Sequence, residues 1–468
     1  MARLGQARAS GGGDGEELTR RIITAVLRIA LRVFFRHIEV AGEERVPLTS
    51  PVIFVLNHPN GLVDPVFLLC LAPRRVSFLA KAPLFRMPVI NFLVRALDSL
   101  PVYRRQDEGS DPARNRETFK AARELLARGG TIAICPEGVS HNDTQLKPLK
   151  SGAARIALGA ASAGAGLDVR VVPAGLYYTA KKTFRSAALL CFGEPIRVEP
   201  VALTQGGDPP REAVQALSDR IRDALLEITL NVEHEEPLQL ISRAEKIYSA
   251  ETQTLARAPD LQRQLRLRRR FVEAYAFHRV HQPERLAALI NRLNRYEEEL
   301  KQAGLDPVRL RPPASTRAVV THLVERLSLF ILLLPCAVIG TIVHYPAYYL
   351  SGLITTRILK AEDDVVSTFK IIGALLLFPL TWSAVGLVCY LKAGWVGALL
   401  SLLIIPVSGL VAIRLAEEWE NFIGGAKAIL YFVKRRWFFN RLIVERRAIR
   451  EEIQALGDEA LGADAMMR

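Results

Sequence analysis

One short run places a histidine and an aspartate directly after an apolar stretch. It reads Pro51-Val-Ile-Phe-Val-Leu-Asn57-His58-Pro-Asn60-Gly61-Leu-Val-Asp64-Pro65. A histidine with a carboxylate one turn away is a minimal arrangement for general-base chemistry on a hydroxyl group. The carboxylate orients the ring and stabilises its protonated form, while the free ring nitrogen accepts the proton. Taken alone, such a pair is more often a structural hydrogen bond, so its meaning depends on what surrounds it.

Three further blocks follow in the chain, and each begins with an apolar run. They are Leu100-Pro-Val-Tyr-Arg104-Arg105, Thr131-Ile-Ala-Ile-Cys-Pro136-Glu137-Gly138-Val-Ser140-His141 and Val171-Val-Pro173-Ala-Gly-Leu176. Ligands of open α/β sheets bind at the carboxyl ends of the strands, so we expect His58, Arg104 and Glu137 to meet there. Arginine binds phosphate in a fork, and a carboxylate accepts hydroxyl donors. The set therefore suits a phosphorylated polyol.

Each residue also has a purely structural interpretation. Glu137, after Pro136, could be only a carboxylate that stabilises the first turn of a helix. Arg104 and Arg105 could be a solvated pair of charges. Pro173 ends a strand and would line the wall of a pocket under either interpretation. The four blocks in this order indicate a function more specifically than any single residue does.

The four blocks, in this order, resemble the glycerolipid (glycerophosphate) acyltransferase family over about residues 45–200. The usual first motif of that family is His, four residues, Asp, whereas five residues separate His58 from Asp64. This form is similar to the branch of glycerol-3-phosphate and dihydroxyacetone-phosphate acyltransferases typified by fungal endoplasmic-reticulum enzymes. Ser140 stands where the commoner Pro-Glu-Gly-Thr-Arg-Ser pattern has an arginine. The phosphate contact is therefore expected at Arg104, which matches the second motif, with Arg105 and Lys150 as helpers.

The resemblance implies a glycerol-3-phosphate O-acyltransferase that makes lysophosphatidic acid for phospholipid synthesis. His58, oriented by Asp64, would deprotonate the sn-1 hydroxyl as it attacks the thioester of acyl-CoA or an acyl carrier protein. No metal or bound cofactor is expected. The substrate-binding set would be Arg104, Arg105, Glu137, Gly138, Ser140 and Lys150, and the pocket wall would be Asn57, Pro136 and Pro173.

Other functions stay open at this point. Within the same chemistry, the acceptor could be dihydroxyacetone phosphate or 1-acylglycerol 3-phosphate. A protein of another class, a non-catalytic membrane scaffold or lipid-transfer protein, could keep the same fold. The sequence does not decide the acyl chain length, the donor or the oligomeric state.

Composition indicates a membrane partner. Of the 468 residues, 50% are hydrophobic, and 62 Lys and Arg against 48 Asp and Glu give a net charge of +14. Basic proteins bind nucleic acid, anionic lipid or phosphorylated substrates. Aromatic residues make up only 7%, and no zinc-finger or RNA-binding aromatic motif occurs, so we expect no nucleic-acid partner. The five cysteines have no paired spacing and are expected to be reduced and buried.

Residues 45–232 alternate short apolar runs with helical stretches, which predicts an α/β domain with a mostly parallel sheet and helices on both faces. The clearest helix spans 113–128, and 211–232 would close the domain. The expected strands are 52–56, 76–79, 99–102, 131–135, 169–173 and 188–192.

Residues 1–44 are expected to be a disordered start followed by a basic amphipathic helix on the membrane surface. Apolar residues recur at helical spacing from Leu18 to Phe34, and five arginines (Arg20, Arg21, Arg28, Arg32 and Arg36) fill much of the other face. This pattern is typical of a helix on anionic lipid. An ordinary surface helix that packs on the domain is the alternative.

The rest of the chain is predicted to be helical and partly membrane-embedded. Residues 233–312 form a charged helical region and linker, 313–413 a membrane region with apolar segments at 327–343, 371–391 and 393–413, and 414–468 a basic amphipathic tail along the membrane. About 20 apolar residues cross a bilayer, so the second and third segments should span it. Basic residues at both ends favour two spans, a re-entrant first segment and cytoplasmic termini, at the inner membrane if the protein is bacterial.

Overall fold

The structure is a computed structural model that describes residues 14–104, 114–163, 166–232, 235–249, 260–307, 310, 316–358 and 365–467. Residues 1–13 of the expected disordered start, 1–14, lie outside this range. The chain divides into two compact units. The first comprises Met1–Asn231, Asp260–Leu265 and Glu362–Thr368, and the second comprises Val232–Pro259, Arg266–Ala361 and Phe369–Arg468.

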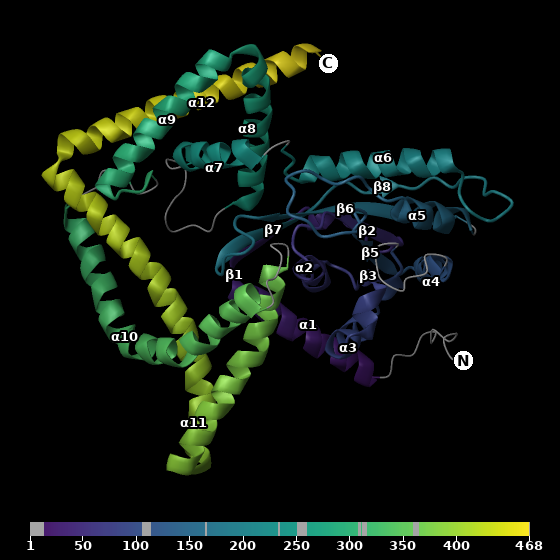
Figure 1. The fold of residues 1–468 in the computed structure, drawn as a ribbon, viewed down its shortest axis with the longest axis horizontal. Helices are drawn as coiled ribbons and strands as arrows, with labels where there is room; N and C mark the ends of the chain where they lie inside the picture. The colour runs from purple at the N-terminus through teal and green to yellow at the C-terminus, as the bar shows by residue number, and fades with distance from the viewer. Residues whose placement is uncertain are drawn as a thin grey trace. The chain divides into compact units, whose positions relative to one another are not determined.

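The first unit is an α/β domain (Figure 1). Its strands are β1 (Phe35–Ala41), β2 (Val52–Leu56), β3 (Ser77–Lys81), β4 (Leu100–Val102), β5 (Thr131–Ile134), β6 (Arg170–Tyr178), β7 (Ser186–Phe192) and β8 (Ile196–Arg197). Its helices are α1 (Asp14–Phe34), α2 (Val63–Leu71), α3 (Pro88–Ala96), α4 (Asn115–Ala127), α5 (Gly152–Ser162) and α6 (Arg211–Ile228), with short 3₁₀ turns at Glu43–Arg45 and Ala82–Arg86.

The strands form one sheet in the order β1-β7-β6-β2-β5-β3-β4, with β8 beside β6. The pairs β2–β5, β2–β6, β3–β5, β3–β4 and β1–β7 are parallel, whereas β7 and β8 run antiparallel to β6. The expected fold class is confirmed. Each of the six expected strands is present, and β6 continues five residues beyond the expected end at Pro173, to Tyr178. The sequence pattern did not predict β1 and β8.

One face of the sheet is covered by α4, α5 and α6. Their apolar sides pack on strand residues such as Ile53, Val55 and Val171, which are fully buried. All five residues of β2, between β5 and β6, are buried, so both of its faces are covered, which explains its uninterrupted apolar sequence. The carboxyl end of β2 is thus held rigidly by its two parallel neighbours.

Helix α1 is amphipathic as expected, but its basic side contributes contacts to the domain. Arg20 is 8% exposed and donates hydrogen bonds to Asp98 and to the carbonyl oxygen of Val76. Arg28 donates to the carbonyl of Cys70. A stripe of apolar residues remains exposed on the same helix, at Leu18, Ile22, Val26 and Ile29.

The second unit is helical. Its helices are α7 (Glu235–Ser249), α8 (Leu261–His281, whose first residues belong to the first unit), α9 (Pro283–Ala303), α10 (Thr316–Leu353), α11 (Val366–Lys434, whose first residues also belong to the first unit) and α12 (Arg436–Met467), with a π-helical turn at Ile354–Ile358. Within α7, α9 and α12, buried side chains such as Tyr296, Phe439 and Ile449 form the core.

The tail packs against other helices of its unit and does not present its whole apolar side to a membrane. Phe439, expected among the tail's membrane contacts, is fully buried, whereas Trp437 is 76% exposed. Ion pairs reinforce this packing: Arg285 bonds Glu452 and Glu459, and Arg292 bonds Glu445. The apolar pattern of 414–468 therefore serves helix packing for much of its length.

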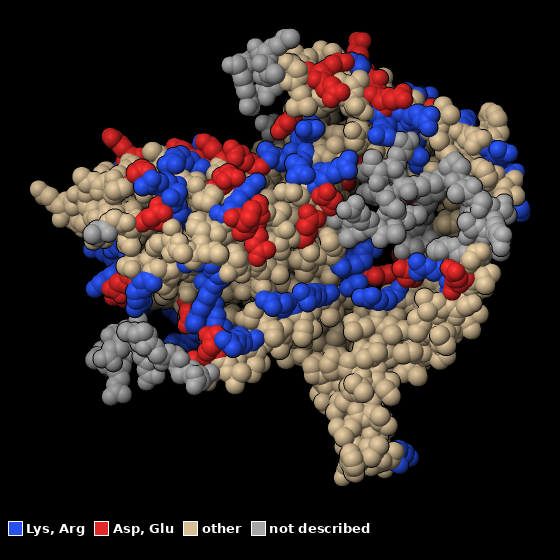
Figure 2. Space-filling model, turned by 180° about the vertical axis from the view of Figure 1, so that it is seen from behind, with Lys and Arg blue, Asp and Glu red and all other residues tan. Residues whose placement is uncertain are grey.

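Among the described residues, two helices are long and apolar enough to cross a membrane, Val324–Arg357 and Val366–Lys434. The second reverses direction at Gly394, where the backbone leaves the helical conformation (φ 67°, ψ −165°). The connection between the predicted segments 371–391 and 393–413 is therefore tight. Figure 2 shows the hairpin of α11 as a surface almost without charged side chains.

The first apolar segment, 327–343, is not interrupted at Pro335, because α10 continues helically through it. Glycines allow α10 to approach α11 closely. A Cβ atom on Gly340 would lie 2.1 Å from the carbonyl oxygen of Ser408, and one on Gly409 would lie 2.7 Å from the ring of His344. Small residues at such contacts are typical of helices that pack within a membrane.

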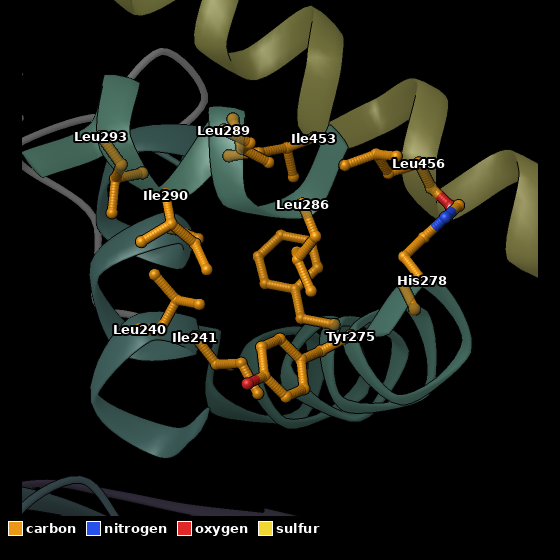
Figure 3. A pocket seen from close by; sticks show the side chains of 13 residues that line it. Leu240, Ile241, Tyr275, His278, Leu286, Leu289, Ile290, Leu293, Ile453 and Leu456 are labelled. Atoms are coloured by element: carbon orange, nitrogen blue, oxygen red, sulfur yellow. The ribbon is translucent and has the colours of Figure 1, made fainter. Parts of the chain in front are cut away.

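The second unit also holds an apolar cavity of about 60 Å³ between α7, α8, α9 and α12 (Figure 3). Leu240, Leu286 and Leu293 are among its lining residues. His278 lies at one side, where its Nε2 atom bonds the carbonyl oxygen of Leu456 at 2.8 Å. None of the residues of the four sequence blocks lines this cavity.

Candidate active site

His58 and Asp64 form a hydrogen-bonded pair just beyond the carboxyl end of β2. Nδ1 of His58 lies 3.0 Å from Oδ2 of Asp64. The aspartate is fully buried in the first turn of α2, and the histidine side chain is 17% exposed. With Nδ1 facing the carboxylate, the ring can use Nε2 to accept a proton. The two residues expected as base and partner are thus together.

Both oxygens of Asp64 are occupied. Oδ2 also accepts the backbone N–H of Asn60 at 2.7 Å, and Oδ1 accepts the hydroxyl of Tyr178, at the end of β6, at 2.6 Å. Burial and the nearby charge of Asp64 raise the pKa of Tyr178 well above its ordinary value. The phenol therefore keeps its proton and acts as a donor, which fixes the orientation of the carboxylate.

Glu137 joins the loop after β5 to the loop after β2. It is 2% exposed, and its Oε1 accepts the backbone N–H of His58 at 3.0 Å. Its Oε2 accepts the backbone N–H of Lys147 at 2.8 Å and lies 2.5 Å from Nε2 of His141. Glu137 thus holds the backbone of the base, a contact different from the predicted contact with acceptor hydroxyls, which stays a prediction.

Cys135 is a second neighbour of the His58 ring. It follows β5, whose parallel register with β2 pairs Ile134 with Val55, and its side chain is near enough to His58 to affect the pKa of the ring. Burial lowers the pKa of His58, but the opposing effects of Cys135 and Asp64 raise it well above its ordinary value. The ring therefore binds a proton strongly.

Two cationic side chains converge on the turn at Gly138. Nη1 of Arg104, after β4, donates to the carbonyl oxygen of Gly138 at 2.7 Å. The Lys150 side chain packs against Gly138, because a Cβ atom on this glycine would lie 2.9 Å from its Cε. Gly138 has a φ of +75°, a conformation that favours glycine. Arg104 and Lys150 thus both contact the turn at Gly138, and their binding of a phosphate stays a prediction.

The other predicted residues lie around this centre. Asn57 extends the ladder between β2 and β6, since its amide bonds the backbone N–H and carbonyl of Leu176 at 2.7 and 3.0 Å. Pro136 accepts the N–H of Lys150 through its carbonyl, and Pro173 is buried opposite Val55 in the sheet. Ser140 is partly buried in the loop after Gly138. Arg105 lies outside the described residues.

Sequence reasoning missed several contributors. Tyr178 follows the third apolar block by two residues. A tyrosine at the end of a strand is the sequence feature that could have identified it. Lys181 donates from Nζ to the carbonyl of Pro59 at 2.8 Å, and Thr368 accepts the N–H of Leu62 at 3.2 Å through its Oγ1. No local pattern marks these two residues.

The comparison with known families covers both units. The Acyltransferase family model matches residues 37–177, which contain the dyad, Arg104 and the Gly138 turn. A second model, the glycerol-3-phosphate acyltransferase 2 C-terminal domain, matches residues 240–460. The chain belongs to the glycerolipid acyltransferase family. The resemblance drawn from the four sequence blocks is thereby confirmed.

Individual relatives of this acyltransferase are distant. It is 26% identical over 461 residues to an uncharacterized acyltransferase of Schizosaccharomyces pombe, covering 78% of this chain and 67% of the relative. It is 27% identical over 462 residues to glycerol-3-phosphate O-acyltransferase 1 of Saccharomyces cerevisiae, covering 77% and 60%. The chain thus spans about two thirds or less of these relatives. Among solved structures, it is similar to the 1-acyl-sn-glycerophosphate acyltransferase of Thermotoga maritima, with 21% identity and a TM-score of 0.34, over 46% of this chain and 83% of that one.

Proposed function

We propose that this protein transfers a fatty acyl chain from a thioester, acyl-CoA or acyl carrier protein, to the sn-1 hydroxyl of glycerol 3-phosphate. One structural observation supports this most directly. A single turn, Cys135–Gly138, contacts both the base and a cation: Glu137 holds the backbone of His58, and the carbonyl of Gly138 accepts Arg104. The acceptor carries a hydroxyl group close to a phosphate group. A base for the hydroxyl and a cation for the phosphate, both held by one turn, would suit this arrangement.

In the proposed reaction, His58 takes the proton of the acceptor hydroxyl as its oxygen bonds the thioester carbonyl carbon. The carbon–sulfur bond then breaks, and the thiol leaves with the proton that His58 held. Asp64 stabilises the protonated ring during this step. Arg104 and Lys150 bind the phosphate by charge-assisted hydrogen bonds. The route forms no bond between protein and acyl chain, and it needs no metal or bound cofactor.

The membrane is part of this proposal. A donor with a long acyl chain partitions into lipid, because each buried methylene group contributes about 0.8 kcal/mol. The two apolar helices supply the anchor. The exposed apolar stripe of α1, from Leu18 to Ile29, supplies a further contact with the cytoplasmic leaflet. Substrate and site would then meet at the membrane interface.

The test is an acyl-transfer assay on membranes that carry the protein, beside a His58→Ala control. Labelled glycerol 3-phosphate, dihydroxyacetone phosphate and 1-acylglycerol 3-phosphate are each offered with palmitoyl-CoA and with palmitoyl acyl carrier protein. Lysophosphatidic acid from glycerol 3-phosphate that disappears in the control is the expected result. Product from another acceptor alone would correct the substrate and keep the chemistry.

A third outcome would favour a function of another class. If no acceptor yields product with either donor, and the His58→Ala protein still supports whatever lipid phenotype the parent supports, a scaffold or lipid-transfer role would replace catalysis. The matches to glycerol-3-phosphate O-acyltransferase sequences over most of the chain favour the enzyme.

A further inference from the structure

The turn between the base and its carboxylate is one residue longer than the usual family motif, since five residues separate His58 from Asp64. Within it, Gly61 has a φ of +36°, and the carbonyl of Asn60 accepts the N–H of Val63 at 2.9 Å. Leu62 occupies the N-cap position of α2. Backbone N–H groups at a helix start have no acceptor within their own helix, so the N–H of Leu62 needs one from elsewhere.

That acceptor comes from the start of α11, more than 300 residues later in the chain. Oγ1 of Thr368 accepts the N–H of Leu62 at 3.2 Å across 306 residues of sequence. Thr368 is 5% exposed and Ser367 is fully buried. Residues up to Thr368 belong to the same compact unit as the dyad.

A second connection reaches the other end of the turn. The hydroxyl of Ser367 donates to the carbonyl oxygen of Lys181, and Nζ of Lys181 donates to the carbonyl oxygen of Pro59 at 2.8 Å. Pro59 directly follows His58, and Leu62 lies two residues before Asp64. The two hydroxyl groups thus bracket the whole turn.

We propose that Ser367 and Thr368 are positioning residues for the catalytic dyad, which hold the lengthened turn so that Asp64 stays aligned with His58. This inference rests on the proposed function only where turnover is the readout. It makes the first turn of α11 a part of the catalytic apparatus, although it lies outside the segment that the Acyltransferase family model matches. It also accounts for the extra residue, because the longer turn has an external support.

The decisive variant is Thr368→Val, which removes the hydroxyl and keeps the shape. A small displacement of a catalytic group costs up to about 10²-fold in rate, so we expect kcat to fall roughly 10- to 100-fold while both KM values change less than about twofold. Thr368→Ser should restore turnover. Thr381→Val is the matched control, since Thr381 lies in the same helix and donates to the carbonyl of Leu377 in that helix.

Hydrogen–deuterium exchange of the full-length protein in detergent provides a readout that needs no substrate. The peptide that contains residues 57–66 should exchange faster in Thr368→Val than in the parent or in Thr381→Val. Lys181→Met, which removes the hydrogen bond to Pro59, should also speed the exchange of this peptide. It replaces Thr368→Val in the experiment if that variant does not fold.

The outcomes separate this inference from the proposed function. Unchanged exchange in both variants overturns the support of the turn. Faster exchange with unchanged kcat overturns the positioning role. If the parent acylates none of the acceptors, the proposed function fails, and exchange alone decides whether the support exists.

Discussion

Tyr178 donates a 2.6 Å hydrogen bond to Oδ1 of Asp64, the carboxylate oxygen opposite the one that faces His58. The base therefore has a partner that is itself oriented from a central strand. Such support matters because catalytic groups must be held within a fraction of an ångström of their working geometry. His58, Asp64 and Tyr178 thus form one chain of hydrogen bonds, and in the proposed reaction the phenol supports the carboxylate as the carboxylate supports the base.

Tyr178→Phe should lower turnover more than substrate binding. A hydrogen bond to a charged group is worth about 1.5–3 kcal/mol, so kcat should fall roughly 10- to 150-fold if most of that energy aligns Asp64. Tyr177→Phe is the matched control, because neighbouring residues of a strand point to opposite faces. Steady-state kinetics on both variants measure the effect. Equal turnover in parent and Tyr178→Phe would remove the phenol from the mechanism.

The raised pKa of His58 makes a pH prediction. Burial lowers this pKa, whereas Cys135 and Asp64 raise it well above its ordinary value. Only the unprotonated ring is a base, so kcat/KM should increase as pH rises through that raised pKa. Asp64→Asn removes one cause of the increase and should shift the acidic limb of the profile to lower pH, while turnover falls roughly 10²-fold or more.

Cys135→Ala should also move the acidic limb to lower pH, but with turnover largely kept, because the proposed route forms no bond to the thiol. Cys191→Ala is the matched control, since Cys191 is buried in β7, which β6 separates from β2 in the sheet. If the acidic limb of the pH profile does not move in Asp64→Asn, that limb does not report the pKa of His58.

Arg104→Ala should mainly raise the KM for the acceptor. Losing one charge-assisted contact of about 1.5–3 kcal/mol corresponds to a rise of roughly 10- to 150-fold, with kcat changed little. Arg114→Ala tests the specificity of this effect, because that guanidinium lies 4.6 Å from the ring centre of Tyr103, beside the same segment. An unaltered KM for glycerol 3-phosphate in Arg104→Ala would place the phosphate elsewhere.

The sequence predicts the parts of the site that depend on short-range pattern. The apolar run Val52–Leu56 coincides with β2, and the histidine and aspartate after it do meet, since a strand end and the following helix fix both. Tyr178 and Thr368 lie 114 and 306 residues from their partners in the chain. Contacts at such separations follow from the tertiary fold, which no local periodicity encodes.

Helix α1 shows a different limit. Its periodicity predicts two faces, but not which one meets the domain. The arginine side makes specific contacts because Asp98 and the carbonyl of Val76 offer acceptors to Arg20. A desolvated guanidinium is stable only with such partners. Which face of α1 contacts the domain therefore depends on residues that follow Arg20 by more than fifty positions.

Glu137→Gln distinguishes two roles for the buried carboxylate. If Glu137 chiefly holds the backbone of His58 and Lys147, an amide should serve poorly, because only one of its two terminal atoms accepts a hydrogen bond while three donors face the carboxylate. We then expect kcat and thermal stability to fall together, with the free energy of unfolding lower by about 2–4 kcal/mol, and the acceptor KM to stay unchanged.

Asp143→Asn is the control for Glu137→Gln, since that exposed carboxylate pairs with the side chains of Lys147 at 3.1 Å and His141 at 3.7 Å, so the substitution removes side-chain pairing beside Glu137. Calorimetry and steady-state kinetics on the two variants give the comparison. A raised acceptor KM with unchanged thermal stability would instead make Glu137 a ligand of the acceptor hydroxyls. The three protein contacts favour the first result, because a carboxylate with both oxygens occupied has little capacity left for a substrate.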